Sequence, residues 1–165
     1  MAKQVVVTIG RQFGSGGHEI GNLLAERLDY SASFQAVECT QPLNEQVYDL
    51  QCEIIRKLAA KGSCVMVGRC ADYVLKDQAE CLNVFIYAEK EDRIKRIAQR
   101  YDLSERKAAD KIKRIDRERK SYYEFHTGSD WGSIEAHQML LNVSKLGVEG
   151  TVDVLEAICR RKMKE

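Results

Sequence analysis

The chain has 165 residues, a length that suits one domain whose core needs no disulfide or metal. Its 26 basic and 25 acidic side chains leave a formal net charge of +1, so bulk charge gives no reason to expect a nucleic-acid or membrane partner. No apolar run approaches the roughly 20 residues that span a bilayer, and MAKQVVVTIG carries no signal-peptide pattern, so we expect a cytoplasmic protein.

Short apolar runs alternate with helical patterns along the chain. Continuous apolar runs without polar alternation are typical of strands that are covered on both faces. The predicted strands are residues 5–9, 64–68, 82–88 and 139–144. The predicted helices are residues 18–28, 43–61, 90–101, 104 to about 120, and 148–163. This order predicts an α/β fold with a parallel sheet.

Some boundaries carry local signals. Ser104 is a good N-cap residue for the helix that follows it, and Pro42 stands where helices often begin. Residues 29–40 have no clear pattern and leave room for one short strand. The closing RRKMKE is most simply a solvated helix end. The six cysteines form no CxxC pair, which indicates reduced, mostly buried thiols and no metal site.

Residues 10–17 read GRQFGSGG and contain four glycines directly after the first predicted strand. A glycine turn between a strand and a helix offers unpaired N–H groups and the positive end of the helix dipole to an anion. The turn therefore predicts a phosphate site made by Gly14, Ser15, Gly16 and Gly17. The alternative is a tight turn that binds no ligand.

This loop departs from the common phosphate-loop pattern GxxxxGK[ST]. Aligned on GSGG, Gly17 occupies the position of the lysine and Arg11 that of the first glycine, while His18 and Glu19 follow. A dinucleotide-binding GxGxxG pattern is excluded, because Glu19 stands where its third glycine is needed.

A second motif, VMVGRCADYVL, places Gly68 and Arg69 at the carboxyl end of a strand, the edge of an open parallel sheet where ligands bind. An arginine there can grip a phosphate with two parallel hydrogen bonds. The alternative is a surface arginine paired with a nearby acid such as Asp72.

A third group of basic residues lies on the predicted helices. Residues 93, 96 and 100 are arginines at helical spacing and share one face. A second basic run precedes SYYEFHTGSDWG and contains Arg114, Asp116, Arg117 and Arg119. Interspersed acids also allow a plain salt-bridged helix face. The aromatic residues of this region, which either stack on a base or pack within the protein, are Tyr122, Tyr123, Phe125 and Trp131.

Taken together, these motifs resemble the cytidylate kinases, and most closely the branch called cytidylate kinase-like proteins. The resemblance covers nearly the whole chain and rests on VTIGRQFGSGGHEIG, VMVGRCADYVL, VFIYAEKEDRIKRI, SYYEFHTGSDWG and LLNVSKLGVEGTVDVL. It implies a three-layer P-loop kinase fold, a parallel sheet flanked by helices, with a helical lid over about residues 102–132. It also implies nucleotide partners and transfer of the γ-phosphoryl group of Mg·ATP to CMP or dCMP.

The resemblance also implies roles for individual residues. Gly14 to Gly17 would hold the ATP phosphates, and Arg69 matches the GRD arginine that binds the acceptor monophosphate. Asp116 and Arg119 match a D-x-x-R pair that contacts the acceptor nucleotide. Weaker matches, suited to stabilising the transferred charge, are Arg93, Arg96, Arg114 and Arg117.

This chain departs from the cytidylate kinase pattern in three places. Gly17 replaces the phosphate-loop lysine, Cys70 replaces the aspartate of GRD, and the CMP-binding insertion is cut short around residues 30–40. We therefore hypothesise that His18 or Arg11 supplies part of the missing positive charge. The corresponding hypothesis for Mg²⁺ is that it is held, directly or through water, by Glu19 or Asp72.

Two classes of function remain open at this point. One is a phosphotransferase acting on CMP, dCMP or another small acceptor. The other is a catalytically degenerate nucleotide-binding module that keeps the fold and the anion site.

Overall fold

The computed structural model of the protein describes residues 3–34, 45–78 and 80–165. Its centre is a five-stranded parallel sheet in the order β2-β3-β1-β4-β5. The strands are β1 (Val6–Arg11), β2 (Ser31–Phe34), β3 (Cys64–Val67), β4 (Cys81–Tyr87) and β5 (Met139–Asn142). Because β1 is central, its carboxyl end is flanked by those of β3 and β4.

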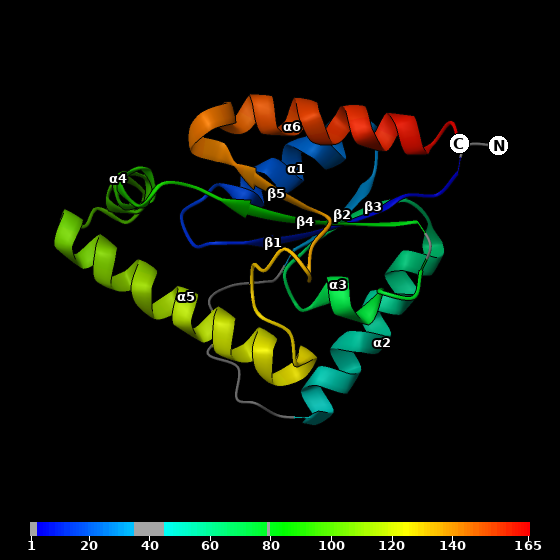
Figure 1. Cartoon of the computed structure of the whole chain (residues 1–165), viewed down its shortest axis with the longest axis horizontal. Coiled ribbons are helices and arrows are strands. Elements are labelled where there is room, and N and C mark those ends of the chain that lie inside the picture. The colour runs from blue at the N-terminus through cyan, green and yellow to red at the C-terminus, as the bar shows by residue number, and fades with distance from the viewer. Residues whose placement is uncertain (1–2, 35–44, 79) are drawn as a thin grey trace.

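Helices cover both faces of this sheet. They are α1 (Gly17–Leu28), α2 (Glu45–Lys61), α3 (Ala71–Val74), α4 (Lys90–Tyr101), α5 (Glu105–Thr127) and α6 (Val143–Lys162). In Figure 1, α1 and α6 lie on one face, whereas α2, α3 and α5 lie on the other. The helix α4 stands beyond the arrowhead of β4 (Figure 1). The predicted three-layer α/β fold with a parallel sheet is confirmed.

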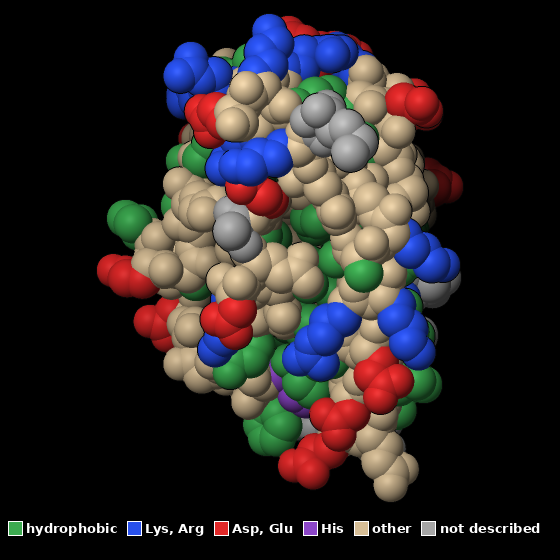
Figure 2. Space-filling view, turned by 90° about the vertical axis from the view of Figure 1, so that its right-hand side faces the viewer, with side chains coloured by type: hydrophobic (Ala, Val, Ile, Leu, Met, Phe, Trp, Pro, Cys, Tyr) green, Lys and Arg blue, Asp and Glu red, His purple; other side chains and the backbone are tan. Residues whose placement is uncertain are grey.

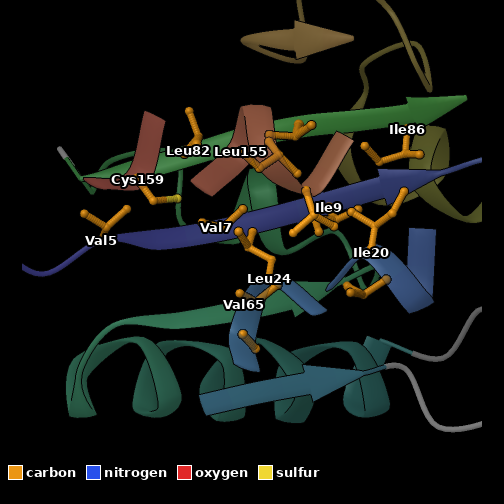
Figure 3. Close-up of a cluster of buried hydrophobic side chains, with 14 of the residues drawn as sticks. Val5, Val7, Ile9, Ile20, Leu24, Val65, Leu82, Ile86, Leu155 and Cys159 are labelled. Atoms are coloured by element: carbon orange, nitrogen blue, oxygen red, sulfur yellow. The ribbon is translucent and has the colours of Figure 1, made fainter. Parts of the chain in front are cut away.

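The core explains why the strand sequences are continuously apolar. Val7 and Ile9 of β1 pack with Leu24 of α1 and Leu155 of α6 on one face of the sheet (Figure 3). Val6, which precedes Val7, faces the other way, into a cluster that includes residues of α2 and α3. Since both faces of β1 are buried, its side chains are mostly apolar, and the buried Thr8 hydroxyl donates a hydrogen bond to Asn83 (2.6 Å).

Several helix ends differ from the prediction, each for a local reason. The helix α5 continues to Thr127 and does not end near residue 120, since Tyr123 is buried on its inner face and the turn at Gly128 (φ 68°) ends it. The strand β5 stops at Asn142, whose side chain accepts a hydrogen bond from the Ser144 N–H (3.0 Å) and so caps α6. The predicted start at residue 148 matches the regular part of α6, which follows a non-helical Gly147 (φ 71°).

Two local predictions fall near residues 29–44. The room left for a short strand is taken by β2, Ser31–Phe34. Cys39, Pro42 and the predicted helix start at residue 43 lie outside the described residues, and α2 is described from Glu45. The predicted N-cap at Ser104 is confirmed, because its Oγ accepts a hydrogen bond from the Lys107 N–H (3.3 Å).

The surface mixes both signs of charge. Figure 2 shows basic and acidic side chains interspersed on the side of the molecule that carries the two termini in Figure 1. The solvated end of α6 is confirmed by exposed Arg160 and Arg161, the first paired with Glu156 at 2.7 Å. Within the described residues, the cysteines are all buried and unpaired, no cluster of potential metal ligands forms, and no helix is long and apolar enough to cross a membrane.

Candidate functional site: a glycine turn beside an arginine-lined pocket

The glycine turn links the end of β1 to the start of α1. Gly14 (φ 80°) and Gly16 (φ 85°) adopt left-handed backbone conformations that favour glycine. Ser15 is buried and donates both its N–H (3.3 Å) and its hydroxyl (2.7 Å) to the carbonyl of Gln12. No side chain of the described chain caps the N-terminus of α1, where Gly16 is the N-cap residue. The first N–H groups of α1 are therefore available to an anion.

Residues of α4 and α5 hold the backbone of this turn. The Asp116 carboxylate accepts a hydrogen bond from the Phe13 N–H (2.7 Å) and forms an ion pair with Arg93 (2.7 Å). Arg93 also donates to the Phe13 carbonyl (3.3 Å). Both charged side chains are largely buried, at 11% exposed for Arg93 and 18% for Asp116. The family resemblance implies nucleotide contacts for these two residues, but in the structure they bind each other and the loop.

A guanidinium also lies directly over the turn. A Cβ placed on Gly16 would stand 3.1 Å from Nη1 of Arg96, which also forms an ion pair with Glu19 (3.1 Å). Arg96 therefore stands close to the amides that a phosphate would contact. His18 and Glu19 are exposed on the first turn of α1.

The Gly14→Ala substitution is expected to destabilise the protein by more than Gly128→Ala does. Both positions have positive φ, so each alanine costs about 1 kcal/mol in backbone strain. At position 14 the added Cβ would also lie 2.9 Å from Ile97, whereas at position 128 it would meet nothing within 4 Å. Urea unfolding of the two variants measures the difference, and equal losses would show that α4 does not pack against the turn as described.

A second turn follows β3 and is conformationally strained. Gly68 (φ 78°), Arg69 (φ 58°) and Cys70 (φ 56°) are three consecutive left-handed residues. Two of them are not glycine, and such conformations cost about 1–2 kcal/mol per residue. Strain of this kind persists where the surrounding structure fixes it, commonly at functional sites. Within the described residues, the buried Nε of Arg69 has no hydrogen-bond partner.

The turn after β3 and the carboxyl end of β1, up to Arg11, border a common pocket that opens to solvent. The ends of β1 and β3 form its floor at Gly10 and Gly68. Its charged lining residues are Arg11, Arg69, Arg119 and Asp72, and its aromatic ones are Tyr122, Tyr123, Trp131 and His137. The pocket therefore combines three cationic side chains with one carboxylate, which suits an anionic acceptor that also carries a hydrogen-bond donor.

Asp72 is held by neighbouring polar groups. The Tyr123 hydroxyl donates to its Oδ2 (2.6 Å), and Nδ1 of His137 lies 3.9 Å from the same oxygen. Burial, with the Asp72 contact, raises the pKa of Tyr123, which stays a proton donor. Burial lowers the pKa of His137 against an opposing effect of Asp72, so the imidazole is neutral at pH 7. Neither ring nitrogen of His137 has a hydrogen-bond partner among the described residues.

Arg11 joins the glycine turn to the pocket. It lines the pocket, while its Cβ and Cγ lie against Gly17 of the turn. Arg119 donates to the Arg11 carbonyl (3.3 Å), and its guanidinium lies 5.4 Å from the Phe13 ring centre. Burial and then the positive charge of Arg119 lower the pKa of Arg11 to about 9.

The structure brings together only part of the predicted site. Arg11, Arg69, Asp72 and Arg119 line the pocket, and Gly14 to Gly17 form the adjoining turn. Arg114 and Arg117 lie on the exposed face of α5, with Arg114 paired to Glu118 (3.3 Å), and neither lines the pocket. His137 was not predicted, since it follows no motif and becomes a candidate only when the fold buries it beside Asp72.

The aromatic residues of this region differ in whether they line the pocket. Trp131 packs edge-on against Phe85 with ring centres 5.2 Å apart, yet it also lines the pocket. Tyr122 lines the pocket and donates its hydroxyl to Gln51 (3.0 Å). Phe125 is 59% exposed and does not line the pocket.

The residues present fit a nucleotide polyphosphate better than a dedicated magnesium site. The turn offers backbone amides, and Arg96 adds a nearby cation. The Ser15 hydroxyl is already bonded within the turn, and the Glu19 carboxylate is paired with Arg96. The carboxylate that lines the pocket and could bind magnesium is therefore that of Asp72. Mg²⁺ commonly binds proteins through one or two carboxylates and substrate phosphates.

The chain has a five-stranded parallel sheet, a glycine turn after the first strand, and an arginine-lined pocket at the carboxyl ends of the strands. Together these features define a P-loop kinase-type protein. The fold is similar to that of a gluconokinase from Sinorhizobium meliloti (TM-score 0.65, 13% identity, 99% of this chain and 96% of that one). A higher similarity is found to the crystal structure of an uncharacterized protein from Eubacterium ventriosum (TM-score 0.85, 30% identity, 95% and 99% of the chains).

The model of the cytidylate kinase-like family matches residues 6–36 and 30–145, and the chain belongs to this family. A curated relative, the cytidylate kinase of Ignicoccus hospitalis, is 27% identical over 160 residues, which cover 94% of this chain and 88% of that one. The predicted family is therefore confirmed. Family and fold together support a kinase-like function with nucleotide substrates.

Proposed function

We propose that this protein is an ATP-dependent phosphotransferase that moves the γ-phosphoryl group to CMP, dCMP or a related small acceptor. The observation that carries the proposal is the junction at Arg11, where the glycine turn adjoins the arginine-lined pocket. A donor phosphate on the turn and an acceptor in the pocket would meet there. Phosphoryl transfer asks a protein mainly for positioning and electrostatic stabilisation, which this arrangement can supply.

On the donor side, the N–H groups of Gly14 to Gly17 would bind the ATP phosphates, with Arg96 beside them. Mg²⁺ would neutralise phosphate charge, held mostly by phosphate oxygens and by Asp72 directly or through water. Because ATP is the proposed donor, we place the protein in the cytoplasm.

On the acceptor side, Arg69 and Arg119 would bind the acceptor phosphate. Asp72, oriented by the Tyr123 hydroxyl, would accept a hydrogen bond from an amino or hydroxyl group of the acceptor. The side chains of Trp131 and Tyr122 would border its base or ring. Residues 102–132 would act as the lid, since α5 contributes Arg119 and Tyr123 to the pocket.

A second candidate, a nucleotide-binding module without turnover, is favoured by two substitutions in the site. Gly17 stands where the common loop has a lysine, and the buried Cys70 stands where the GRD motif has an aspartate. Such a module would bind ATP through the turn and respond by a conformational change.

An ADP-release assay with MgATP across CMP, dCMP, UMP, AMP and GMP separates the candidates. We expect release with CMP or dCMP well above the rate with water alone. Saturable ATP binding without release for any acceptor would select the binding module. Absence of both binding and release would contradict the two candidates together.

A further inference from the structure

The glycine turn differs from the common loop at two positions. In GxxxxGK[ST] the first position is glycine and the seventh is lysine. Aligned on GSGG, the first position of this chain is Arg11 and the seventh is Gly17, so the cation and the glycine have exchanged places. If the two positions had changed independently, a cation gained at one position would not need to accompany a cation lost at the other.

The structure gives the exchange a steric cause. A Cβ placed on Gly17 would lie 2.7 Å from Cβ and 2.8 Å from Cγ of Arg11, distances that real side chains essentially never show. The Arg11 side chain therefore runs through the space in which a side chain at position 17 would begin. The space between positions 11 and 17 holds one long side chain. That side chain can come from position 11 at the end of β1 or from position 17 at the start of α1.

The charges around Arg11 leave a place for an anion. The neighbouring charged groups that act on it are Arg119, which repels it, and Asp116, which is already bound to Arg93 and to the Phe13 N–H. The hydrogen bond from Arg119 is accepted by the Arg11 backbone carbonyl and does not involve the Arg11 guanidinium. Two adjacent guanidinium groups in a partly buried site are stabilised when a phosphate binds between them.

His18, the other residue considered for the missing charge, is less suited to it. Burial, Arg11 and Arg100 all lower the pKa of His18, so the imidazole is neutral at pH 7. It is also exposed on α1 and does not line the pocket.

We propose that Arg11 replaces the phosphate-loop lysine, binding the outer ATP phosphates from the end of β1, and that Gly17 is required to make room for it. This proposal rests on the proposed function for its ligand, whereas its steric half concerns the protein alone. The two halves are therefore tested separately.

The steric half is tested without any ligand by a double-mutant cycle. Gly17→Ala in the natural chain should lower the melting temperature by about 2–6 °C, because the new methyl group collides with Arg11. In the Arg11→Gly background the same substitution should cause no loss, since the colliding atoms are gone. Equal losses in both backgrounds would overturn the exchange.

The ligand half is tested by calorimetric titration with MgATP at pH 7. Arg11→Ala should weaken binding about 10- to 100-fold, the effect of losing one charge-assisted phosphate contact. Arg56→Ala, which removes an exposed arginine of α2, should leave the affinity unchanged. Arg11→Gly with Gly17→Lys recreates the order GQFGSGK and should recover most of the affinity that Arg11→Gly alone loses.

These outcomes are distinguishable from failure of the proposed function. If the natural chain binds MgATP and Arg11→Ala binds it equally well, the role of Arg11 is wrong while phosphotransfer stands. If the double variant binds no better than Arg11→Gly, the exchange of positions is overturned. If the natural chain does not bind MgATP, both the proposed function and the ligand half fail, and the melting-temperature cycle still decides the steric half.

Discussion

Replacing Asp116 by alanine is expected to lower the free energy of unfolding by about 3 kcal/mol or more. The substitution leaves Arg93, only 11% exposed, without its ionic partner, and it leaves the Phe13 N–H without its acceptor. Breaking one side of a buried ion pair costs about 3–5 kcal/mol, since the remaining charge stays desolvated. Because Asp116 holds the glycine turn, nucleotide affinity should fall as well.

Urea unfolding measures this effect, and Glu118→Ala is the matched control. Glu118 lies on the same helix and pairs with Arg114, but both side chains are exposed (43% and 56%), so its removal should cost at most about 1 kcal/mol. Asp116→Asn keeps an oxygen acceptor for the Phe13 N–H and should fall between the two. A loss for Asp116→Ala as small as that of the control would contradict the bracing role of this ion pair.

Replacing Arg69 is expected to reduce phosphotransfer about 10²- to 10³-fold, the effect of removing one preorganised donor from a reacting anion. Two replacements with opposite effects on stability make the test specific. Arg69→Gly removes the guanidinium and also relieves the left-handed backbone (φ 58°), whereas Arg69→Ala removes the guanidinium and keeps the strain. The glycine variant should therefore be about 1 kcal/mol more stable than the alanine variant, yet equally inactive.

Acceptor kinetics and urea unfolding of the two variants provide the measurements for Arg69. Retained turnover in both would remove Arg69 from the acceptor site. Equal stability of the two variants would show that the backbone at this position is not strained. Strain would then no longer support a functional role for the turn after β3.

Much of the fold was predictable because the strands are buried on both faces. The apolar runs of β1, β3 and β4 have no polar alternation, and each became a strand within one or two residues of its predicted bounds. The end of α5 was predicted too early, because the sequence SYYEFHT has no helix-specific pattern. Its helical conformation accompanies the burial of Tyr123, which only the structure shows. The first turn of α6, from Val143 to the non-helical Gly147, was likewise not predicted.

The candidate site was only partly predictable for a related reason. Motif positions identified Arg69 and Arg119 as candidates, and the structure places both in the pocket. The pairing of Asp116 with Arg93 and the burial of His137 depend on contacts between distant segments, which no spacing reveals. Arg11 in the place of a glycine was visible in the sequence, but its collision with position 17 needed coordinates.

The central claim is that the backbone amides of the glycine turn bind a nucleotide polyphosphate without a lysine. Backbone amide chemical shifts in an NMR titration with a non-hydrolysable ATP analogue and Mg²⁺ test it directly, because each glycine amide reports separately. We expect saturable shifts concentrated at Gly14, Ser15, Gly16 and Gly17, with smaller ones at the end of β1 around Arg11. Unmoved turn amides at saturating nucleotide, or shifts confined to another surface, would contradict it.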